Sequence, residues 1–474
     1  MFERAGEAIA YIRNNGVEMV DVKFTNLFGG WHHITMPAAR IGEKLLEEGE
    51  GFDGSSVPGF TRLEKGDMLL VPDLTSGFLD PFCALKTLSF LGTIVTTEGR
   101  ALYHRDPRGI LRRAEACLAS LGWATRSLWG PELEFYVFDS VQYDNTVHGA
   151  AYSVDSDEAA WRSKEKSGAG YAVPLGRGYH AAPPLDRLHD LRTEMVKILT
   201  ELGIPIRYHH HEVGGPGQCE IEPAIGPALK LADAVMIIKY VAKMVSVRHG
   251  KSATFMPKPL YGEAGNGLHF HLTVKKGDEP VFFDASGYAG LSKLAHSFIA
   301  GILEHGPALL GLCNPSTNSY KRLVPGYEAP INLFFSSGNR SAAIRIPDYA
   351  RAPEEKRCEF RPPDATCNPY LAMSAILLAG IDGVERKLDP AALGFGPIDE
   401  NIFEWSDEKR RVIRPLPTSL ADALRALEAD HEFLLRGGVF TEDILQAWNT
   451  RKLRELVDVQ RRPHPYEVEL YYAV

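Results

Sequence analysis

The chain has 474 residues, of which 45% are hydrophobic and 24% charged, and its formal net charge is -9. This length exceeds one ordinary hydrophobic core and predicts two domains, and the composition is that of a globular protein. An acidic balance without a Lys/Arg-rich run argues against nucleic acid as a partner. The most apolar stretch, residues 371–384, is shorter than the ~20 residues that cross a bilayer. It predicts a buried core helix, and no membrane partner is expected.

Six cysteines are scattered along the chain without a CxxC pair. In a chain of this length, that pattern predicts free thiols in a reducing compartment. The first residues also lack the basic-then-apolar order of a signal peptide. A cytoplasmic location is therefore expected.

The elements begin with a short amphipathic helix over residues 4–14 and a strand over residues 20–24. In that strand the apolar residues alternate with Asp21 and Lys23, which predicts a half-buried strand. Turn residues and a second strand follow up to residue 36, so we expect the fold to begin with a hairpin.

A helix is predicted shortly after residue 105. Asp106 can cap it, Pro107 suits its first position, and Gly122 can end it. We therefore place a small β-rich domain over residues 1–105 and a large α+β domain over residues 106–474.

Three short motifs resemble known functional motifs but are incomplete. Residues 250–252 read Gly-Lys-Ser, but Val245 stands where a phosphate-binding loop needs its first glycine. Residues 54–59 have the wrong spacing for a GxSxG nucleophile turn. Residues 209–211 are three histidines, yet neighbours on a strand point to opposite faces, so all three cannot bind one ion.

The informative pattern is acid residues within apolar strands. Glu132 and Glu134 lie at i and i+2, and therefore on one strand face. A single such pair is more often a solvated face. Here, however, the pattern recurs in further charged pairs: Glu212 and Glu220 around a glycine-containing turn, His269 and His271, and Glu359 and Arg361.

Burying several carboxylates close together is costly unless cations neutralise them. Five glutamates and one histidine on strand-like segments match the ligand set of a pair of Mg²⁺ or Mn²⁺ ions. Two such ions holding polyphosphate oxygens are used in phosphoryl transfer.

Four arginines lie in short segments that are rich in apolar residues: Arg322, Arg340, Arg345 and Arg361. Any one of them alone is readily explained as a structural ion pair or a surface side chain. Together with the acid cluster, they suit neutralising a triphosphate and holding a substrate carboxylate.

Several longer stretches are specific enough to carry a family resemblance. They are Phe52-Asp53-Gly54-Ser55-Ser56, Gly130-Pro131-Glu132-Leu133-Glu134-Phe135, residues 210–220, Phe255-Met256-Pro257-Lys258-Pro259, the long run 314–330, residues 339–347, Asn368-Pro369-Tyr370-Leu371 and residues 464–472. Through these motifs the chain resembles the bacterial (type I) glutamine synthetases over essentially its whole length.

This resemblance implies an α+β fold of the glutamine synthetase/guanido kinase type. A β-grasp N-terminal domain would precede a catalytic domain built on a curved antiparallel sheet flanked by helices. It also implies a homo-oligomer, a dodecamer of two stacked hexameric rings with each active site between neighbouring subunits. The implied reaction is the ATP-dependent ligation of ammonia to the γ-carboxylate of glutamate through γ-glutamyl phosphate, in nitrogen assimilation.

The resemblance also implies residue roles, carried over by matching motif. One Mg²⁺ or Mn²⁺ ion would be held by Glu134, Glu212 and Glu220, and a second by Glu132, His269 and Glu359. The substrate ATP would be contacted by His271, Thr273, Arg340, Arg345 and Arg357. Glutamate would be held by Gly265, Arg322, Glu328 and Arg361. The ammonium pocket would comprise Asp53, Ser56, Tyr179 and Glu212.

Three of these residues would act in catalysis. Asp53, offered by the adjacent subunit, would take a proton from ammonium. Arg345 would stabilise the transferring phosphoryl group. Glu328 would lie on a loop that closes over the acyl phosphate.

Some positions depart from the usual pattern of the family. Ala264 stands where Asn is common before the glycine that contacts glutamate, and Glu354 where Lys is common near ATP. Phe403 occupies the position of a tyrosine that many bacterial members adenylylate, and phenylalanine has no hydroxyl to accept AMP.

Two other functions are compatible with parts of this pattern. The first is that of a related ligase that couples glutamate to a larger amine, but the presence of Asp53, Ser56 and Tyr179 favours ammonium. The second is a non-catalytic relative, which would be expected to lose metal ligands, whereas all six positions are filled here.

Overall fold

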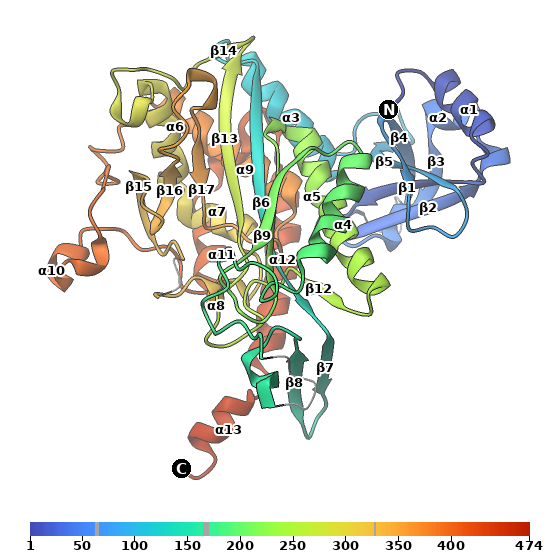
Figure 1. The fold of residues 1–474 in the computed structure, drawn as a ribbon. Coiled ribbons are helices and arrows are strands. Elements are labelled where there is room, and N and C mark those ends of the chain that lie inside the picture. Colours follow the sequence, from blue (N-terminus) through green and yellow to red (C-terminus); the bar gives the residue numbers. More distant parts are fainter. Residues whose placement is uncertain (62–65, 165–169, 327–328) are drawn as a thin grey trace.

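The computed structural model describes residues 1–61, 66–164, 170–326 and 329–474 (Figure 1). Glu328 lies outside the described residues, and so does the side chain of Phe403. Figure 1 shows a smaller N-terminal sheet region, in blue, beside a larger body built around a second sheet.

The N-terminal sheet has the strand order β2-β1-β5-β4-β3. Its strands are β1 (Met19–Thr25), β2 (Trp31–Pro37), β3 (Glu50–Asp53), β4 (Asp67–Asp80) and β5 (Thr87–Thr96). β1 pairs antiparallel with β2 and parallel with β5, and the helices of this part are α1 (Ala5–Asn14) and α2 (Glu43–Glu48). The predicted first helix and hairpin are confirmed.

The prediction that the first strand is half-buried is wrong, because both faces of β1 are covered. Asp21 is 3% exposed and Lys23 is 6% exposed. Lys23 pairs with Asp21, and its Nζ lies 3.2 Å from Asp80 Oδ2 and 3.1 Å from Ser89 Oγ. These partners compensate the buried ammonium. The Tyr240 hydroxyl donates to Asp80 at 3.1 Å and joins this strand to the larger body.

Helix α3 (Pro107–Ser120) begins as predicted. The Asp106 carboxylate accepts a hydrogen bond from the Gly109 amide at 3.1 Å, and Gly122 adopts a left-handed φ of 78° just beyond the helix. Arg108 on α3 is buried between Asp73 of β4, at 3.0 Å, and Asp233, at 2.7 Å. It therefore links the two sheet regions. The domain boundary near residue 105 stays a prediction.

The larger sheet follows the order β15-β16-β17-β13-β6-β10-β9, and β11, β12 and β14 pair with its central strands. All of these pairs are antiparallel except β15 with β16. The strands are β6 (Arg126–Phe138), β9 (Ile206–His211), β10 (Gln218–Pro223), β11 (Gly226–Pro227), β12 (Ser252–Thr254), β13 (Leu268–Lys276), β14 (Glu279–Pro280), β15 (Asn332–Ser337), β16 (Ala342–Ile346) and β17 (Cys358–Phe360).

Helices cover one face of this sheet (Figure 1). Leu133 and Phe135 of β6 are fully buried in the core on that side, so Glu132 and Glu134, which alternate with them along the strand, face the other side. The helices of the larger body are α3, α4 (His189–Glu201), α5 (Ala228–Arg248), α6 (Lys293–Glu304), α7 (Gly306–Cys313), α8 (Ser319–Arg322), α9 (Pro369–Glu385), α10 (Asp407–Arg410), α11 (Leu420–Ala429), α12 (Glu442–Gln460) and α13 (Pro465–Tyr471).

Helix α9 is the core helix predicted for residues 371–384, and nearly all of its residues are buried. In the described ranges of the chain, no helix is long and apolar enough to cross a membrane.

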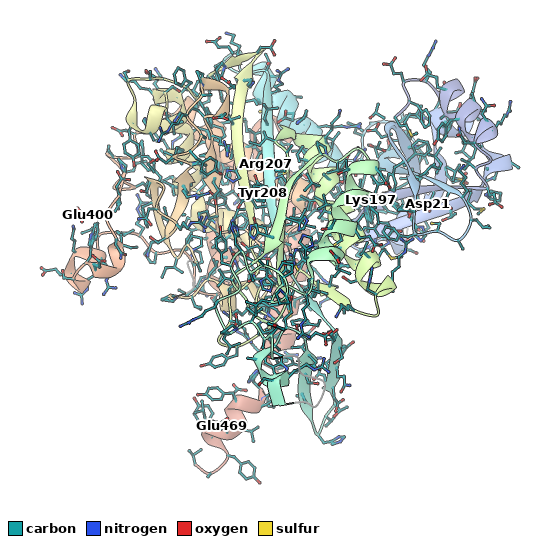
Figure 2. The ribbon with its side chains drawn as sticks, in the orientation of Figure 1. Asp21, Lys197, Arg207, Tyr208, Glu400 and Glu469 are labelled. Atoms are coloured by element: carbon teal, nitrogen blue, oxygen red, sulfur yellow. The ribbon has the colours of Figure 1, made fainter. Side chains whose placement is uncertain are left out.

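Two segments project from the larger body: the hairpin of β7 (Ser140–Asn145) and β8 (Ala150–Asp155), and helix α13 (Figure 1). Figure 2 places Glu469 on this projecting helix. Both segments expose large apolar or aromatic side chains, including Tyr143, Tyr152, Leu470 and Tyr472.

Candidate active site

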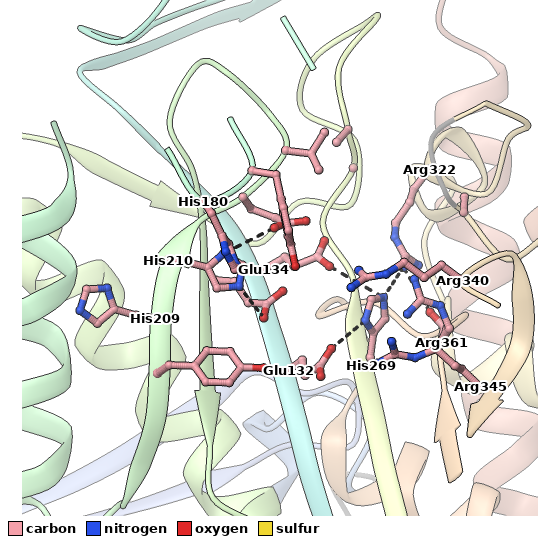
Figure 3. A pocket seen from close by; sticks show the side chains of 18 of the residues that line it. Glu132, Glu134, His180, His209, His210, His269, Arg322, Arg340, Arg345 and Arg361 are labelled. Atoms are coloured by element: carbon pink, nitrogen blue, oxygen red, sulfur yellow. Dashed lines mark hydrogen bonds and ion pairs between the residues drawn. The ribbon is translucent and has the colours of Figure 1, made fainter. Parts of the chain in front are cut away.

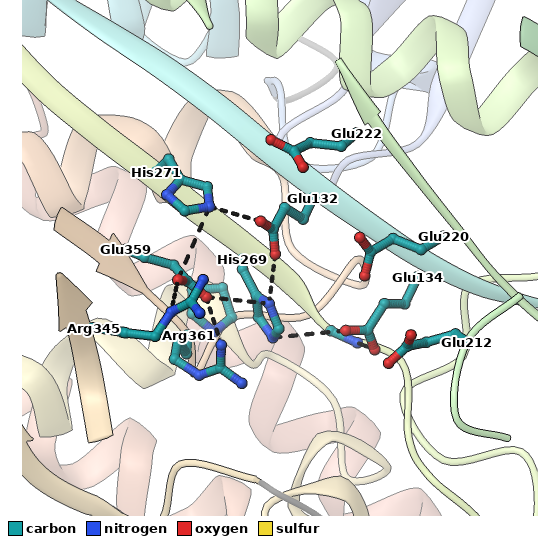
Figure 4. A network of polar contacts seen from close by, with 12 residues as sticks. Glu132, Glu134, Glu212, Glu220, Glu222, His269, His271, Arg345, Glu359 and Arg361 are labelled. Carbon is teal, nitrogen blue, oxygen red and sulfur yellow. Dashed lines mark hydrogen bonds and ion pairs between the residues drawn. The ribbon is translucent and has the colours of Figure 1, made fainter. Parts of the chain in front are cut away.

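The register of the larger sheet aligns the first group of candidate residues across four strands. His269 on β13 lies opposite Glu132 on β6, and His271 lies opposite Glu359 on β17. Arg345 on β16 lies opposite Glu359 in turn. Because side chains alternate between faces, all five point away from the helix-covered face. Figure 4 shows them converging.

The Glu132 carboxylate binds two imidazoles. His269 Nδ1 lies 3.1 Å from its Oε2, and His271 Nε2 lies 2.7 Å from its Oε1. Arg322 Nη2 and Arg357 Nε approach the other ring nitrogens at 3.2 and 3.3 Å. Arginine only donates, so those nitrogens accept and the rings donate to Glu132. Burial raises the pKa of Glu132, but the two histidines outweigh it and hold the pKa well below its usual value.

Glu359 is completely buried between two guanidinium groups. Arg345 Nε donates to its Oε2 at 2.5 Å, and Arg361 Nη1 donates to its Oε1 at 2.6 Å. Burial raises the pKa of Glu359, but Arg361, His271 and Arg345 outweigh it and lower the pKa. The carboxylate is therefore ionised and already neutralised by protein cations.

The second group lies at the next strand pair. Glu134 on β6 faces Glu220 on β10, which faces His210 on β9. Glu212, expected on a strand, lies just beyond the end of β9. His210 Nε2 is 3.3 Å from Glu220 Oε1, and its Nδ1 is 2.9 Å from the carbonyl oxygen of His211. With Nδ1 directed to this carbonyl, Nε2 is directed toward the carboxylates, which is the arrangement of metal-binding histidines.

In the described ranges, this second group has His210 as its ion-pair partner and no Lys or Arg paired with Glu212 or Glu220. Burial and the neighbouring carboxylates raise the pKa of Glu212 and of Glu220 well above the usual value. In the described part of the chain, the buried Oε2 of Glu212 has no hydrogen-bond donor. A divalent cation would supply what this group lacks, so the residues fit a metal.

Two groups of three side chains bring ligand atoms within 4.8 Å of one another in the described residues: Glu132, His271 and Glu359, and His210, Glu212 and Glu220. The remaining two expected ligands are adjacent. Glu134 Oε1 lies 3.8 Å from His269 Nε2, and its Oε2 accepts from the Gly267 amide at 2.7 Å. All six expected ligands are therefore brought together, with His210 and His271 as additional members.

Glu132, Glu134, Glu212, Glu220, His210 and His269 line a cavity of about 850 Å³, whereas Glu359 and His271 are buried and are not among its described lining residues. Figure 3 shows His180 and His210 on one side, Glu132 and Glu134 in the middle, and four arginines on the other side. Those arginines are the four predicted from the sequence: Arg322, Arg340, Arg345 and Arg361.

Gly265 also lines the cavity, beside Arg322. A Cβ at this position would lie 2.5 Å from the Pro257 carbonyl oxygen and 2.7 Å from Arg322 Cγ. Only glycine therefore allows this close approach. The neighbouring Ala264 lines the cavity as well, and its carbonyl accepts from the Tyr136 hydroxyl at 2.8 Å.

Some predicted residues lie elsewhere. Asp53 and Ser56 belong to the N-terminal part and are not among the described residues that line the cavity. The Asp53 carboxylate accepts from Ser55 and Ser56 hydroxyls, each at 2.6 Å, and these bonds lower its pKa. Thr273 is buried on β13, two residues beyond His271, and Glu354 lies in a short turn over Pro353–Glu355. Tyr179, in contrast, lines the cavity.

The sequence interpretation missed His210 and two further residues, one buried beside the cavity and one in its wall. Glu222, on the same face of β10 as Glu220, is 1% exposed and pairs with Arg207. Its i+2 spacing from Glu220 was a visible signal. His180 also lines the cavity, but it follows no periodic pattern that could have identified it. Figure 2 shows Arg207 and Tyr208 in the larger body, whereas Asp21 lies in the N-terminal sheet region.

Comparisons with known proteins agree with this architecture. The family model "Glutamine synthetase, catalytic domain" matches residues 104–471, and "Glutamine synthetase, beta-Grasp domain" matches residues 16–97. Curated glutamine synthetases from Frankia alni and Aquifex aeolicus (strain VF5) are 45% and 46% identical. The alignments cover 100% of this chain and 100% of the relative for the first, and 99% and 98% for the second.

Solved structures give the same result. A cryo-EM structure of Plasmodium falciparum glutamine synthetase matches with a TM-score of 0.89 and 30% identity, covering 99% of both chains. A structure titled "GmaS/ADP complex-Conformation 1" matches with a TM-score of 0.81 and 28% identity over 100% of both chains. The predicted α+β fold, with a β-grasp part and a curved-sheet catalytic part, is confirmed. The chain belongs to the glutamine synthetase family.

Proposed function

We propose that this cavity carries out both halves of glutamine synthesis. The chain is a ligase that uses ATP to join ammonia to glutamate. In the first half, a γ-carboxylate oxygen of glutamate attacks the γ-phosphorus of ATP and ADP leaves. In the second, the nitrogen of ammonia attacks the acyl carbon and inorganic phosphate leaves. The single observation that carries this proposal is the in-register convergence of carboxylates, histidines and arginines in one cavity.

Mg²⁺ or Mn²⁺ is the proposed cofactor, with at least two ions for each subunit. One ion would be held by Glu134, Glu212 and Glu220, and the other by Glu132, His269 and Glu359. The raised pKa values of Glu212 and Glu220 support this requirement for cations. When bound, the ions would neutralise the carboxylates and the phosphate oxygens.

The arginine side of the cavity is proposed to bind the anionic substrates. Arg345 would stabilise the transferring phosphoryl group, and Arg340 and Arg357 would hold ATP together with His271 and Thr273. Glutamate would be gripped next to Gly265, by Arg322, Arg361 and Glu328. The close contact of Gly265 with Arg322 and the burial of Arg361 support this assignment.

Ammonium is proposed to bind at the opposite side, near Glu212 and Tyr179. Asp53 and Ser56 of the adjacent subunit would complete the pocket, and Asp53 would take the proton. The ionised Asp53, whose pKa is lowered by its serine partners, has an exposed carboxylate that a neighbour can use. The reaction then gains a base without burying another charge in the free subunit.

This shared site requires an oligomer, and we propose the dodecamer of two hexameric rings. The projecting α13 and the β7–β8 hairpin support it, because their exposed aromatic side chains need a covering surface. A cytoplasmic location is proposed as well. All six cysteines lie in the described ranges and are free thiols, which suits a reducing compartment.

Purified protein with ATP, Mg²⁺ and glutamate tests the proposal. ADP release should depend on ammonium, and ethylamine or putrescine should replace it poorly. Faster turnover with either larger amine would instead favour the alternative of a ligase for larger amines. No ADP release with any amine would contradict both.

A further inference from the structure

His180 is held in a strained conformation at the wall of the cavity. Its φ is 55°, in the left-handed region that non-glycine residues rarely occupy. Such a conformation is strained and persists only where its surroundings fix it. The His180 amide donates to the His211 carbonyl at 3.0 Å, and the Gly178 amide donates to the Val213 carbonyl at 2.9 Å. The segment is therefore docked along the end of β9.

The strain places three rings in contact. His180 stacks on Tyr179, with ring centroids 4.2 Å apart and planes at 15°. It also packs against His210, with centroids 4.4 Å apart and planes at 61°, and the Tyr179 and His210 centroids are 5.4 Å apart. All three residues line the cavity. We call this set of Tyr179, His180 and His210 the aromatic wall.

The aromatic wall adjoins the carboxylates of the proposed ammonium pocket. His210 Nδ1 lies 3.6 Å from Glu212 Oε2. The stacked His180 ring therefore contributes shape to the side of the pocket that adjoins Glu212.

We propose that His180 is a positioning residue that restricts the amine substrate to ammonium by holding Tyr179 in the aromatic wall. This inference rests on the proposed function, in which Tyr179 and Glu212 bind ammonium. Ammonium presents four N–H groups, whereas methylammonium replaces one of them with a methyl group that needs its own volume. The packed rings of the aromatic wall provide polar and π contacts for ammonium. They exclude methylammonium because its methyl group would clash with them.

Two substitutions separate the ring from the backbone. His180→Asn removes the aromatic ring but tolerates the left-handed conformation, because Asn adopts it readily. His180→Phe keeps a ring that can stack on Tyr179 but removes both nitrogens. The comparison therefore distinguishes stacking from imidazole hydrogen bonding or proton transfer.

The experiment measures kcat/KM for ammonium and for methylamine with saturating glutamate and ATP, and identifies the amide products by mass. His180→Asn should reduce the preference for ammonium over methylamine by roughly tenfold. This is about the ratio of kcat/KM values by which a pocket distinguishes substrates that differ by one methyl-sized group. It should also raise the KM for ammonium and leave the KM for glutamate unchanged. His180→Phe should keep the wild-type preference within about threefold.

An unchanged amine preference in His180→Asn would overturn the inference. So would a loss of preference in His180→Phe equal to that in His180→Asn, because the stacked ring would then not be the cause. Wild-type protein that releases no ADP with glutamate and ammonium would instead overturn the proposed function, before either variant is compared. The two failures are therefore distinguishable.

Discussion

Arg345 and Glu359 face each other at paired positions of β16 and β17, with Arg345 Nε 2.5 Å from Glu359 Oε2. This ion pair neutralises one half of the cavity with the protein's own charge. Among the residues that the structure describes, Glu212 and Glu220 in the other half have no arginine partner and lie beside other carboxylates and His210. The two halves should therefore respond differently to the loss of a carboxylate.

Glu212→Gln should reduce the metal-induced stabilisation without harming the apo fold. The substitution removes like-charge repulsion, so the melting temperature in chelator should be equal to or above that of the wild type. A metal at 100 times its Kd adds about 2.7 kcal/mol to wild-type stability, and much of the corresponding Tm rise should be lost. Glutamine synthesis should fall by roughly 100-fold or more.

Differential scanning fluorimetry with and without Mn²⁺ checks this prediction, with the exposed Glu47→Gln as the matched control. A variant that keeps the full Mn²⁺-induced rise in Tm would show that Glu212 is not a ligand.

Mixed oligomers should reveal whether Asp53 serves a neighbour. Asp53→Asn and Glu212→Gln subunits are each expected to be inactive alone. In random equimolar rings, a site can combine the intact Glu212 of one subunit with the intact Asp53 of the next. About one quarter of the sites should then be restored. Activity of verified mixed oligomers checks this, and no recovery would mean that both residues act within one subunit.

Gly265→Ala should weaken glutamate binding. The new methyl group would lie 2.5 Å from the Pro257 carbonyl oxygen and 2.7 Å from Arg322 Cγ, so Arg322 must move. Overpacking of this kind costs about 1–3 kcal/mol, or roughly 5- to 150-fold in affinity. Steady-state kinetics should show a higher KM for glutamate with little change in the KM for ATP. Equal changes in both constants would indicate general distortion of the cavity.

The sequence predicted the strands of the site better than the pairings within it. The i and i+2 spacing of Glu132 and Glu134 indicated one strand face, and that face is confirmed. Periodicity within a strand cannot show which strand lies next to it. The register that sets His271 opposite Glu359, and His210 opposite Glu220, is fixed by long-range pairing. His210 was therefore missed as a member of the second group.

Burial was also beyond local reasoning at β1. Alternation of polar and apolar residues indicated one solvated face, but Lys23 is buried beside Asp80, which lies 57 residues further along the chain. A charged residue is buried only where an oppositely charged or hydrogen-bonding partner compensates it. A partner that is distant in the sequence cannot be recognised from the local pattern of residues. For the same reason, the sequence did not reveal the ion pair between Arg207 and Glu222, which lie on adjacent strands.

His305 should make stability depend on pH at the alkaline end. It is buried between Asp382, at 2.9 Å, and Asp430, at 2.8 Å. Burial lowers the pKa of His305, but the two carboxylates outweigh it and raise the pKa to about 9. A folded-state pKa above the unfolded value of about 6.5 means that the stabilisation is complete below pH 6.5 and is lost as the pH rises through 9. Its full size is roughly 3 kcal/mol.

The measurement is the Tm difference between the wild type and His305→Gln at pH 6 and at pH 9.5. The difference should be large at pH 6 and should shrink toward pH 9.5. A difference that does not vary with pH would show that His305 is not charged in the folded protein.

The proposed reaction of the cavity joins ammonia to the γ-carboxylate of glutamate at the expense of ATP. It can be measured in a mixture of protein, ¹⁵N-ammonium, glutamate, ATP and Mg²⁺, by ¹⁵N NMR of the product and assay of ADP. One γ-amide ¹⁵N should appear in glutamine for each ADP released, and none in excess chelator. ADP release without ¹⁵N-labelled glutamine would contradict the proposed reaction.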